Sequence, residues 1–173
     1  MNSDELKSFI RDIPDFPKPG IVFKDITPLL ADGRALAATV ERIAEPFLGA
    51  VDLVLGIESR GFIVGAPVAY RLGVGLTIAR KPGKLPYQRV SQQYDLEYGT
   101  DSIEMHQDGI RPNSRVLIVD DLLATGGTAQ AAIGLVNTLG GRVVGCSFVI
   151  ELGFLGGRQR LAPAKCLSLI RYD

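Results

Sequence analysis

The sequence predicts an α/β fold, with a mostly parallel, twisted sheet flanked by helices. From Leu53 onward, short apolar runs alternate with segments of helical periodicity, which is the pattern of repeated β-α-β units. The clearest unit has strands at 116–119 and 143–150 joined by a helix at 129–139. A chain of 173 residues has the usual length of one domain. We therefore expect residues 1–173 to form a single domain that binds its ligands at the carboxyl ends of the strands.

The N-terminal residues, before the β-α-β units, are expected to form a short helix, a proline-rich segment and a strand within the same domain. Residues 2–11 have the period of a short amphipathic helix. Residues 13–20 contain three prolines and a glycine, a composition that disfavours a helix or the interior of a sheet. Residues 21–23 are strand-like and residues 24–28 turn the chain, before a helix that Asp32 caps.

The remaining elements complete the sheet and add a hairpin. They are strands at 53–57, 74–79 and 166–170, a helix at 62–72, and a hairpin formed by residues 91–98 and 102–107. Three loops leave the carboxyl ends of predicted parallel strands, after Ile57, Ala79 and Val119. These ends meet at one edge of such a sheet, so the three loops are expected to converge on one site.

The composition argues against several classes of partner. Lys plus Arg and Asp plus Glu are both 19, so the formal net charge is zero, which disfavours nucleic acid and anionic membranes. The longest uncharged run, 122–141, contains too many Gly, Thr, Gln and Asn residues for a membrane span. The N-terminus lacks the cationic and apolar blocks of a signal peptide. We expect a soluble cytoplasmic protein.

The cysteines and the histidine are not predicted to be catalytic residues. Cys146 and Cys166 both lie in apolar, strand-like runs and are predicted to be buried thiols, not a disulfide framework or a metal site. His106 is the only histidine and lies in the predicted hairpin, where a solvated strand residue is expected. A Ser-His-Asp hydrolase and a histidine metal site are therefore disfavoured.

Residues 116–128 carry the strongest functional signal. Asp120 and Asp121 follow the apolar run, where the strand is expected to end, and Ala124-Thr125-Gly126-Gly127-Thr128 leads into a helix. Backbone N–H groups at a helix N-terminus suit a phosphate, and carboxylates suit sugar hydroxyls or a phosphate-bound Mg²⁺. The alternative is a generic turn in which the acidic pair caps the helix. No Lys follows the glycines, so the stretch is not a P-loop.

Two further segments offer groups that bind anions. Glu58-Ser59-Arg60 follows a strand and opens a helix, although an ordinary turn with a surface arginine would have the same sequence. Residues 80–89 hold Arg80, Lys81, Lys84 and Arg89 and no acid. This basic run is either a solvated face or the start of a lid, residues 80–107, that closes over a polyphosphate and excludes water.

The 116–128 stretch resembles the signature with which type I phosphoribosyltransferases bind phosphoribosyl pyrophosphate (PRPP). Segments 16–28, 58–61, 80–86, 96–99, 116–128 and 161–163 also resemble, in order, those of the adenine phosphoribosyltransferase family. The likeness runs from about Phe16 to the C-terminus. It implies the type I phosphoribosyltransferase fold, with residues 1–32 as an N-terminal helix and a hood over the base, and with 80–107 as a flexible hairpin lid.

The resemblance also implies roles for the base-binding residues. In the hood, backbone groups of Val22 and Lys24 would contact the adenine edge and Phe23 would stack on the ring. The family commonly has Arg at the position of Lys24, which puts a side-chain role of Lys24 in doubt but not a backbone contact. Leu152 would line the base pocket.

The phosphate and proton chemistry is assigned by the same resemblance. Glu58-Ser59 corresponds to a pyrophosphate-loop peptide that is often cis, and Arg60 would act on pyrophosphate as a catalytic residue. The other implied roles are pyrophosphate binding by Arg80, Lys81 and Lys84, ribose and Mg²⁺ binding by Asp120 and Asp121, 5′-phosphate binding by Ala124, Thr125, Gly126, Gly127 and Thr128, and acid/base catalysis at the purine by Glu97 beside Tyr98.

The implied reaction is adenine plus PRPP giving AMP and pyrophosphate, a step of purine salvage. Mg²⁺ would bind mainly through pyrophosphate and ribose oxygens, because the sequence offers no all-protein cage. The family resemblance implies a homodimer. Three alternatives remain open: a phosphoribosyltransferase for guanine, hypoxanthine or xanthine, a non-catalytic PRPP or nucleotide sensor of the same fold, and a ribose-phosphate kinase-like enzyme. The absence of a helix-turn-helix counts against the sensor.

Overall fold

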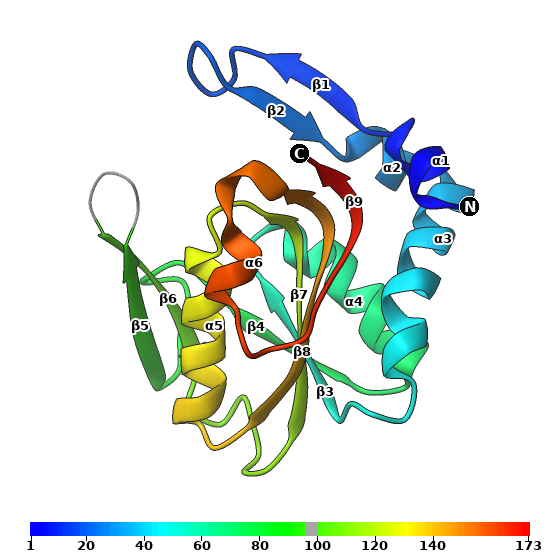
Figure 1. Ribbon diagram of the computed structural model, residues 1–173. Helices are drawn as coiled ribbons and strands as arrows, with labels where there is room; N and C mark the ends of the chain where they lie inside the picture. Colours follow the sequence, from blue (N-terminus) through cyan, green and yellow to red (C-terminus); the bar gives the residue numbers. More distant parts are fainter. Residues whose placement is uncertain (96–99) are drawn as a thin grey trace.

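The computed structural model describes residues 1–95 and 100–173 and is built around a central parallel sheet (Figure 1). In the described part of the chain, this sheet has five strands in the order β4-β3-β7-β8-β9, and every neighbouring pair is parallel. The strands are β3 (Leu53–Ile57), β4 (Gly75–Ala79), β7 (Arg115–Leu123), β8 (Arg142–Leu152) and β9 (Cys166–Tyr172). The predicted α/β architecture is confirmed, and β3 has the predicted bounds.

Helices cover both faces of the sheet. The α-helices are α1 (Ser3–Lys7), α2 (Thr27–Ala31), α3 (Gly33–Ala44), α4 (Arg60–Leu72), α5 (Gly127–Thr138) and α6 (Gly157–Arg160), with short 3-10 turns at η1 (Glu45–Phe47) and η2 (Gly153–Leu155). Asp32 caps α3 as predicted, because its carboxylate accepts from the backbone N–H of Arg34 at 3.0 Å and of Ala35 at 2.8 Å. Gly73 ends α4 in the left-handed conformation.

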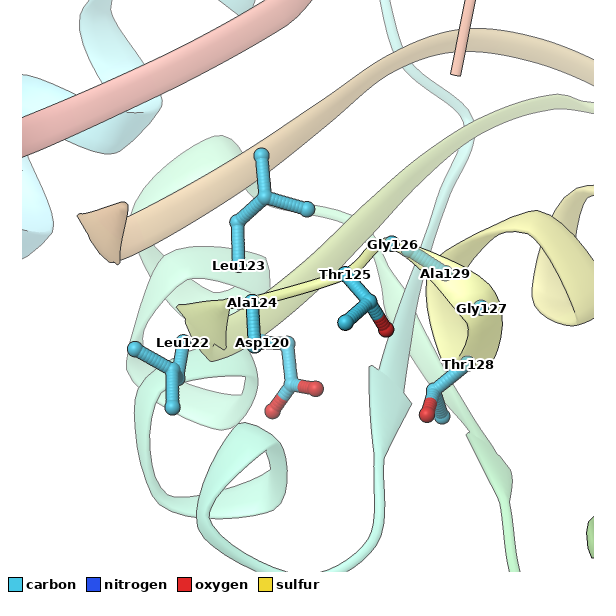
Figure 2. Close-up of a pocket in the computed structure, with 9 residues that line it drawn as sticks. All are labelled: Asp120, Leu122, Leu123, Ala124, Thr125, Gly126, Gly127, Thr128 and Ala129. Atoms are coloured by element: carbon cyan, nitrogen blue, oxygen red, sulfur yellow. The ribbon is translucent and has the colours of Figure 1, made fainter. Parts of the chain in front are cut away.

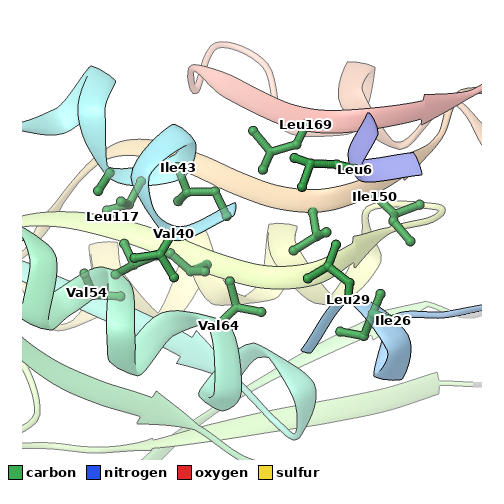
Figure 3. Close-up of a cluster of buried hydrophobic side chains, with 14 of the residues drawn as sticks. Leu6, Ile26, Leu29, Val40, Ile43, Val54, Val64, Leu117, Ile150 and Leu169 are labelled. Carbon is green, nitrogen blue, oxygen red and sulfur yellow. The ribbon is translucent and has the colours of Figure 1, made fainter. Parts of the chain in front are cut away.

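Alternation along the strands divides the core into two layers. Side chains such as Val54 and Leu117 face the helices α1 to α4 and form one buried cluster with Ile43 and Val64 (Figure 3). The next residues along the same strands, such as Ile118, face the other layer with α5. A sheet buried on both faces explains why its strands are continuous apolar runs in the sequence.

Among the residues that the structure describes, two antiparallel pairs of strands lie outside the central sheet. β1 (Arg11–Pro14) pairs with β2 (Val22–Asp25) in the N-terminal region, and β5 (Arg89–Asp95) pairs with β6 (Thr100–His106) beside α5 (Figure 1). The second pair confirms the predicted hairpin between Ala79 and β7. His106 lies at the end of β6, which confirms its predicted place in a strand, but it is half-buried and not solvated as predicted.

Four predictions about local structure were wrong. β7 does not end before Asp120 but continues to Leu123, because its pairing with β8 carries on through both carboxylates. Pro14 lies in β1, where the end of a two-stranded ribbon tolerates a missing N–H. The predicted helix at 2–11 shortens to α1, since residues from Arg11 pair with β2 instead. Residues 24–28 do not form a turn: they end β2 and begin α2, whose first turn accepts Pro28.

The two cysteines differ in burial. Cys146 is buried, and burial raises the pKa of its thiol to about 12. Cys166 is only half-buried, which corrects the prediction for that residue, and it is the register partner of Cys146 on the neighbouring strand.

Among the described residues, no helix combines the length and the apolar character that crossing a membrane requires.

Candidate active site

A phosphate-sized loop forms where β7 passes into α5. Gly126 has a φ of +82°, which a glycine adopts without a steric penalty, and it is the N-cap of α5. No side chain caps this helix, so the backbone N–H groups of its first turn are free to bind an anion. A small cavity of about 80 Å³ lies at this position and is lined by Asp120, Leu122, Leu123, Ala124, Thr125, Gly126, Gly127, Thr128 and Ala129. Figure 2 shows the Asp120 carboxylate and the Thr125 and Thr128 hydroxyls on the same side of the loop.

The two carboxylates at the end of β7 have different environments. Asp121 is buried and forms an ion pair with Arg60, with Nε 2.5 Å from Oδ2. Asp120 accepts from the Asp121 backbone N–H at 2.9 Å. Loss of solvation, reinforced by the Asp121 charge, raises the pKa of Asp120 well above its ordinary value. The Arg60 guanidinium therefore balances negative charge at the end of β7.

The loop after β3 reaches the acidic pair from the neighbouring strand. The Glu58–Ser59 peptide is cis, and Arg60 begins α4 directly after it. Gly61 lies against β7 so closely that a Cβ there would be 2.8 Å from Asp120 Oδ1 and 2.9 Å from the Val119 carbonyl oxygen. The absence of a side chain at Gly61 thus allows the start of α4 to approach the carboxylates.

A cavity of about 400 Å³ brings the predicted loops together. Its lining is Glu58, Ser59, Arg60, Lys81, Asp120, Asp121, Leu122, Ala124 and Thr128, and it shares four of these residues with the smaller cavity. The loops after β3, β4 and β7 all contribute, so the predicted convergence of three loops is present in the structure. A carboxylate pair, a guanidinium, an ammonium group and a helix N-terminus surround this space, and these groups can bind sugar hydroxyls and phosphate oxygens.

The basic segment after β4 is neutralised by carboxylates from elsewhere in the chain. Arg80 Nε donates to Glu58 Oε2 at 3.2 Å, and the Lys84 ammonium also contacts Glu58. Lys81 donates to the Tyr94 hydroxyl at 2.8 Å and contacts Asp101. Burial raises the pKa of Glu58, but the hydrogen bonds from Lys84, Lys81 and Arg80 outweigh it and lower that pKa.

The hood residues lie beside the start of α4. Phe23 is half-buried, packs edge-on to Phe16 with ring centroids 5.2 Å apart, and has the Arg60 guanidinium 5.1 Å from its ring centre. Val22 is exposed. Arg60 thus contacts both the acidic pair and the hood.

A second contact ties the hood to the C-terminal strand. Lys24 pairs with Asp12 at 2.8 Å, and its ammonium lies 4.1 Å from the centre of the Tyr172 ring. Tyr172 is the register partner of Leu152, the last residue of β8. The side chain of Lys24 is therefore already occupied within the chain, while its backbone remains part of β2.

Glu97 and Tyr98, predicted as the acid/base residue and its neighbour, lie outside the described residues. Two glycines of the site, Gly61 and Gly157, were not predicted, because their need for a missing side chain arises from tertiary contacts. Only the position of Gly157 shortly after a strand, in the pair Gly156-Gly157, marked it in the sequence.

Comparison with known proteins places this geometry in a family. The sequence model of the phosphoribosyl transferase domain family matches residues 24–168. Adenine phosphoribosyltransferase from Geobacter metallireducens is 55% identical over 98% of this chain and 99% of its own. The chain belongs to the adenine phosphoribosyltransferase family.

Solved structures of adenine phosphoribosyltransferases share the fold closely. The enzyme from Thermoanaerobacter pseudethanolicus has a TM-score of 0.96 and 52% identity, over 99% of this chain and 100% of that one. The enzyme from Saccharomyces cerevisiae, solved with adenine and D-2,5-dideoxy-2,5-imino-altritol 1,6-bisphosphate, has a TM-score of 0.91 and 38% identity, over 96% and 97% of the two chains. The type I phosphoribosyltransferase fold is confirmed.

Proposed function

We propose that this adenine phosphoribosyltransferase family member transfers the 5-phosphoribosyl group of PRPP to adenine, giving AMP and pyrophosphate in purine salvage. The observation that supports the reaction best is the cavity of about 400 Å³, where residues 58–60, the Asp120–Asp121 pair and Thr128 in the first turn of α5 line one space. Relatives that are 55% and 57% identical carry the same activity in their names.

The reaction makes specific demands on the protein. The nitrogen nucleophile belongs to the purine, so no catalytic serine or cysteine is required. The chain must instead position the two substrates, stabilise the departing pyrophosphate and manage a proton on the ring. In our proposal, Asp120 and Asp121 accept hydrogen bonds from the ribose hydroxyls, and residues 124–128 bind the 5′-phosphate. Arg60 and the amides of Glu58-Ser59 bind pyrophosphate on the opposite side.

We propose that residues 1–173 act as one domain in which residues 80–107 are a lid. Arg80, Lys81 and Lys84 would exchange their present carboxylate partners for pyrophosphate oxygens. In such an exchange one anionic partner replaces another, because each ammonium or guanidinium already pairs with a carboxylate of Glu58 or Asp101. It would bring positive charge to pyrophosphate only when the substrate is bound.

The residues fit Mg²⁺ as a partner of PRPP. Asp120 and Asp121 offer the oxygen ligands that the ion prefers, but no group of three His, Cys, Asp or Glu side chains in the described residues could hold a metal alone. We therefore propose binding through PRPP oxygens and water beside this pair. Bound Mg²⁺ would neutralise part of the pyrophosphate charge.

The base is proposed to bind under the hood. The exposed backbone edge at Val22 and Lys24 would contact adenine, Phe23 would stack on the ring, and Leu152 would line the pocket. The Phe23 ring and the Arg60 guanidinium, which lie 5.1 Å apart, would place the purine next to the pyrophosphate site.

The proton on the purine is assigned to Glu97, with Tyr98 beside it. Replacing Glu97 with Gln is expected to lower kcat by about 10²-fold or more, the usual contribution of a general acid or base, while Kd for PRPP stays the same. Single-turnover kinetics with adenine measures the effect. A variant with unchanged kcat would make Glu97 a structural residue.

One assay tests the reaction and separates the alternatives. Pyrophosphate release is measured with PRPP and each of adenine, guanine, hypoxanthine and xanthine, in Mg²⁺ and in excess EDTA. We expect release with adenine alone, dependent on Mg²⁺. Release with another base would assign a different specificity, and PRPP binding without release would indicate a nucleotide sensor.

We further propose a homodimer formed through the exposed side of α4. Ile63 and Tyr70 lie seven residues apart on one face of this helix, with Tyr70 89% exposed, and Leu76 on the edge strand β4 is also exposed. A second copy of the chain would bury this surface.

Replacing Tyr70 with Glu is expected to raise the dimer dissociation constant by at least about 30-fold, the effect of losing a central aromatic anchor. Light scattering after gel filtration over a range of concentrations measures it. Leu48→Glu, at an exposed apolar residue outside α4 and β4, is the control. Equal effects of the two variants, or none, would place the dimer contact elsewhere.

A further inference from the structure

The backbone at the start of α6 packs directly against the phosphate loop, residues 124–128. A Cβ added at Gly157 would collide with the Ala124 carbonyl oxygen and lie 2.9 Å from the Gly126 nitrogen. A Cβ added at Gly126 would lie 2.6 Å from the Gly157 carbonyl oxygen. The two main chains are thus in direct contact with no side chain between them. The position of Gly157 therefore limits where residues 124–126 can lie.

The residue after Gly157 is fixed by four hydrogen bonds. Arg158 Nε donates to Glu151 Oε1 at 3.0 Å, and its Nη2 donates to Glu151 Oε2. Its Nη1 donates to the Cys166 carbonyl oxygen at 2.7 Å, and Nη2 also reaches Ser168 Oγ at 3.3 Å. The guanidinium is therefore bound to β8 and β9 together, which holds the start of α6 against the sheet.

Glu151 is placed next to the strand that carries the loop. It is only 2% exposed and is the register partner of Leu123, the residue before Ala124. On its other side, Arg171 lies 3.6 Å away. A buried carboxylate is costly without such partners, so the Arg158 contact is strongly favoured. Neither Glu151 nor Arg158 lines the two cavities of the site.

We propose that Glu151 and Arg158 are positioning residues for the 5′-phosphate loop. Their bidentate pair holds Gly157 against residues 124–126 and so fixes the backbone N–H groups that bind the phosphate. The inference rests on the proposed function, because PRPP and AMP are the ligands that carry this phosphate. The affinity for AMP, which carries the 5′-phosphate, should depend on the Glu151–Arg158 pair. The affinity for adenine, which has no phosphate, should not.

The same chain contains a control pair with the same fork geometry, although Asp52 is more exposed than Glu151. Arg115 Nε and Nη2 donate to the two carboxylate oxygens of Asp52 at 3.1 and 2.7 Å, and Nη1 donates to the Gly49 carbonyl oxygen at 3.1 Å. The Asp52–Arg115 pair has the same fork geometry and a backbone acceptor. It lies at the start of β7, however, at the end of the sheet opposite the phosphate loop.

The experiment compares Glu151→Gln and Arg158→Lys with Asp52→Asn and Arg115→Lys. Calorimetry gives Kd for AMP and for adenine, steady-state kinetics gives KM for PRPP and kcat, and thermal unfolding gives Tm. We expect Glu151→Gln to weaken AMP binding and raise KM for PRPP by about tenfold, the scale of one charge-assisted hydrogen bond. Adenine binding and kcat should change less than about twofold. Arg158→Lys, which keeps the charge, should have a smaller effect in the same direction.

Two results would overturn the proposal. One is a Glu151→Gln protein with lowered Tm but wild-type Kd for AMP, which would make the pair purely structural. The other is an equal loss of AMP affinity in Asp52→Asn. If Glu151→Gln does not fold, the test is made with Arg158→Lys, by comparing the change in its Kd for AMP with the change in its Kd for adenine. A wild-type protein that makes no AMP from adenine and PRPP would instead refute the proposed function, and ribose 5-phosphate binding would then test the pair alone.

Discussion

Replacing Asp120 and Asp121 together with asparagine is expected to abolish measurable PRPP binding and to lower kcat/KM for PRPP by about 10³-fold. Each carboxylate would lose a charge-assisted hydrogen bond to a ribose hydroxyl, worth about 1.5–3 kcal/mol, and each 1.36 kcal/mol corresponds to a factor of ten. The variant also removes the partner of Arg60, whose Nε lies 2.5 Å from Asp121. Calorimetry with PRPP and Mg²⁺, followed by steady-state kinetics, measures both quantities.

The single variants should separate the two carboxylates. Asp121→Asn removes the charge that balances Arg60 and lowers the pKa of Asp120 toward its ordinary value, because the Asp121 charge contributes to raising it. Asp120→Asn leaves the Arg60 pair intact. We therefore expect Asp121→Asn to disturb Arg60 and pyrophosphate release more, and Asp120→Asn to act mainly on ribose binding.

Asp32→Asn is a control that makes the same Asp-to-Asn change away from the site. Asp32→Asn replaces a carboxylate by an amide at the N-cap of α3, where asparagine caps equally well. Its PRPP binding and stability should match those of the wild type. Unchanged PRPP uptake in the Asp120/Asp121 double variant would remove the basis of the assigned ribose site.

Features set by hydrophobic burial could be predicted from the sequence. β3 matches its prediction residue for residue, because a strand buried on both faces requires an unbroken apolar run between polar turns. The convergence of the three loops also followed, since parallel strands place their carboxyl ends at one edge. These predictions needed only the period of apolar residues and the topology of β-α-β units.

Features set by tertiary partners could not be predicted. A pair of carboxylates in the sequence marks the end of a buried run, but the hydrogen bonds between β7 and β8 continue past Asp120 to Leu123. The absence of acids from residues 80–89 gave no sign of Glu58, which lies 22 residues before Arg80 and accepts its hydrogen bond. The glycine at 157 is required by a loop some thirty residues away in the chain, and local propensity carries no information about that contact.

Replacing Gly126 with alanine is expected to lower kcat/KM for PRPP by about 10²-fold or more. The new Cβ would lie 2.6 Å from the Gly157 carbonyl oxygen, which is backbone and cannot rotate away. The loop must then move, and a displacement of about 1 Å in a substrate-positioning group costs roughly 10²-fold in rate. Steady-state kinetics with PRPP and calorimetry with AMP measure the loss, and adenine binding should change little because the base lies under the hood in our proposal.

A matched glycine separates this collision from backbone strain. Gly126 and Gly73 have φ values of +82° and +69°, but a Cβ at Gly73 would have no atom within 4 Å. Alanine at either position bears the cost of a left-handed conformation, about 1 kcal/mol of stability. Only the variant at Gly126 also displaces the phosphate loop. Gly73→Ala should therefore lower Tm without changing kcat/KM for PRPP, and a Gly126→Ala enzyme with the same kinetics as Gly73→Ala would show that the contact with Gly157 does not shape the phosphate site.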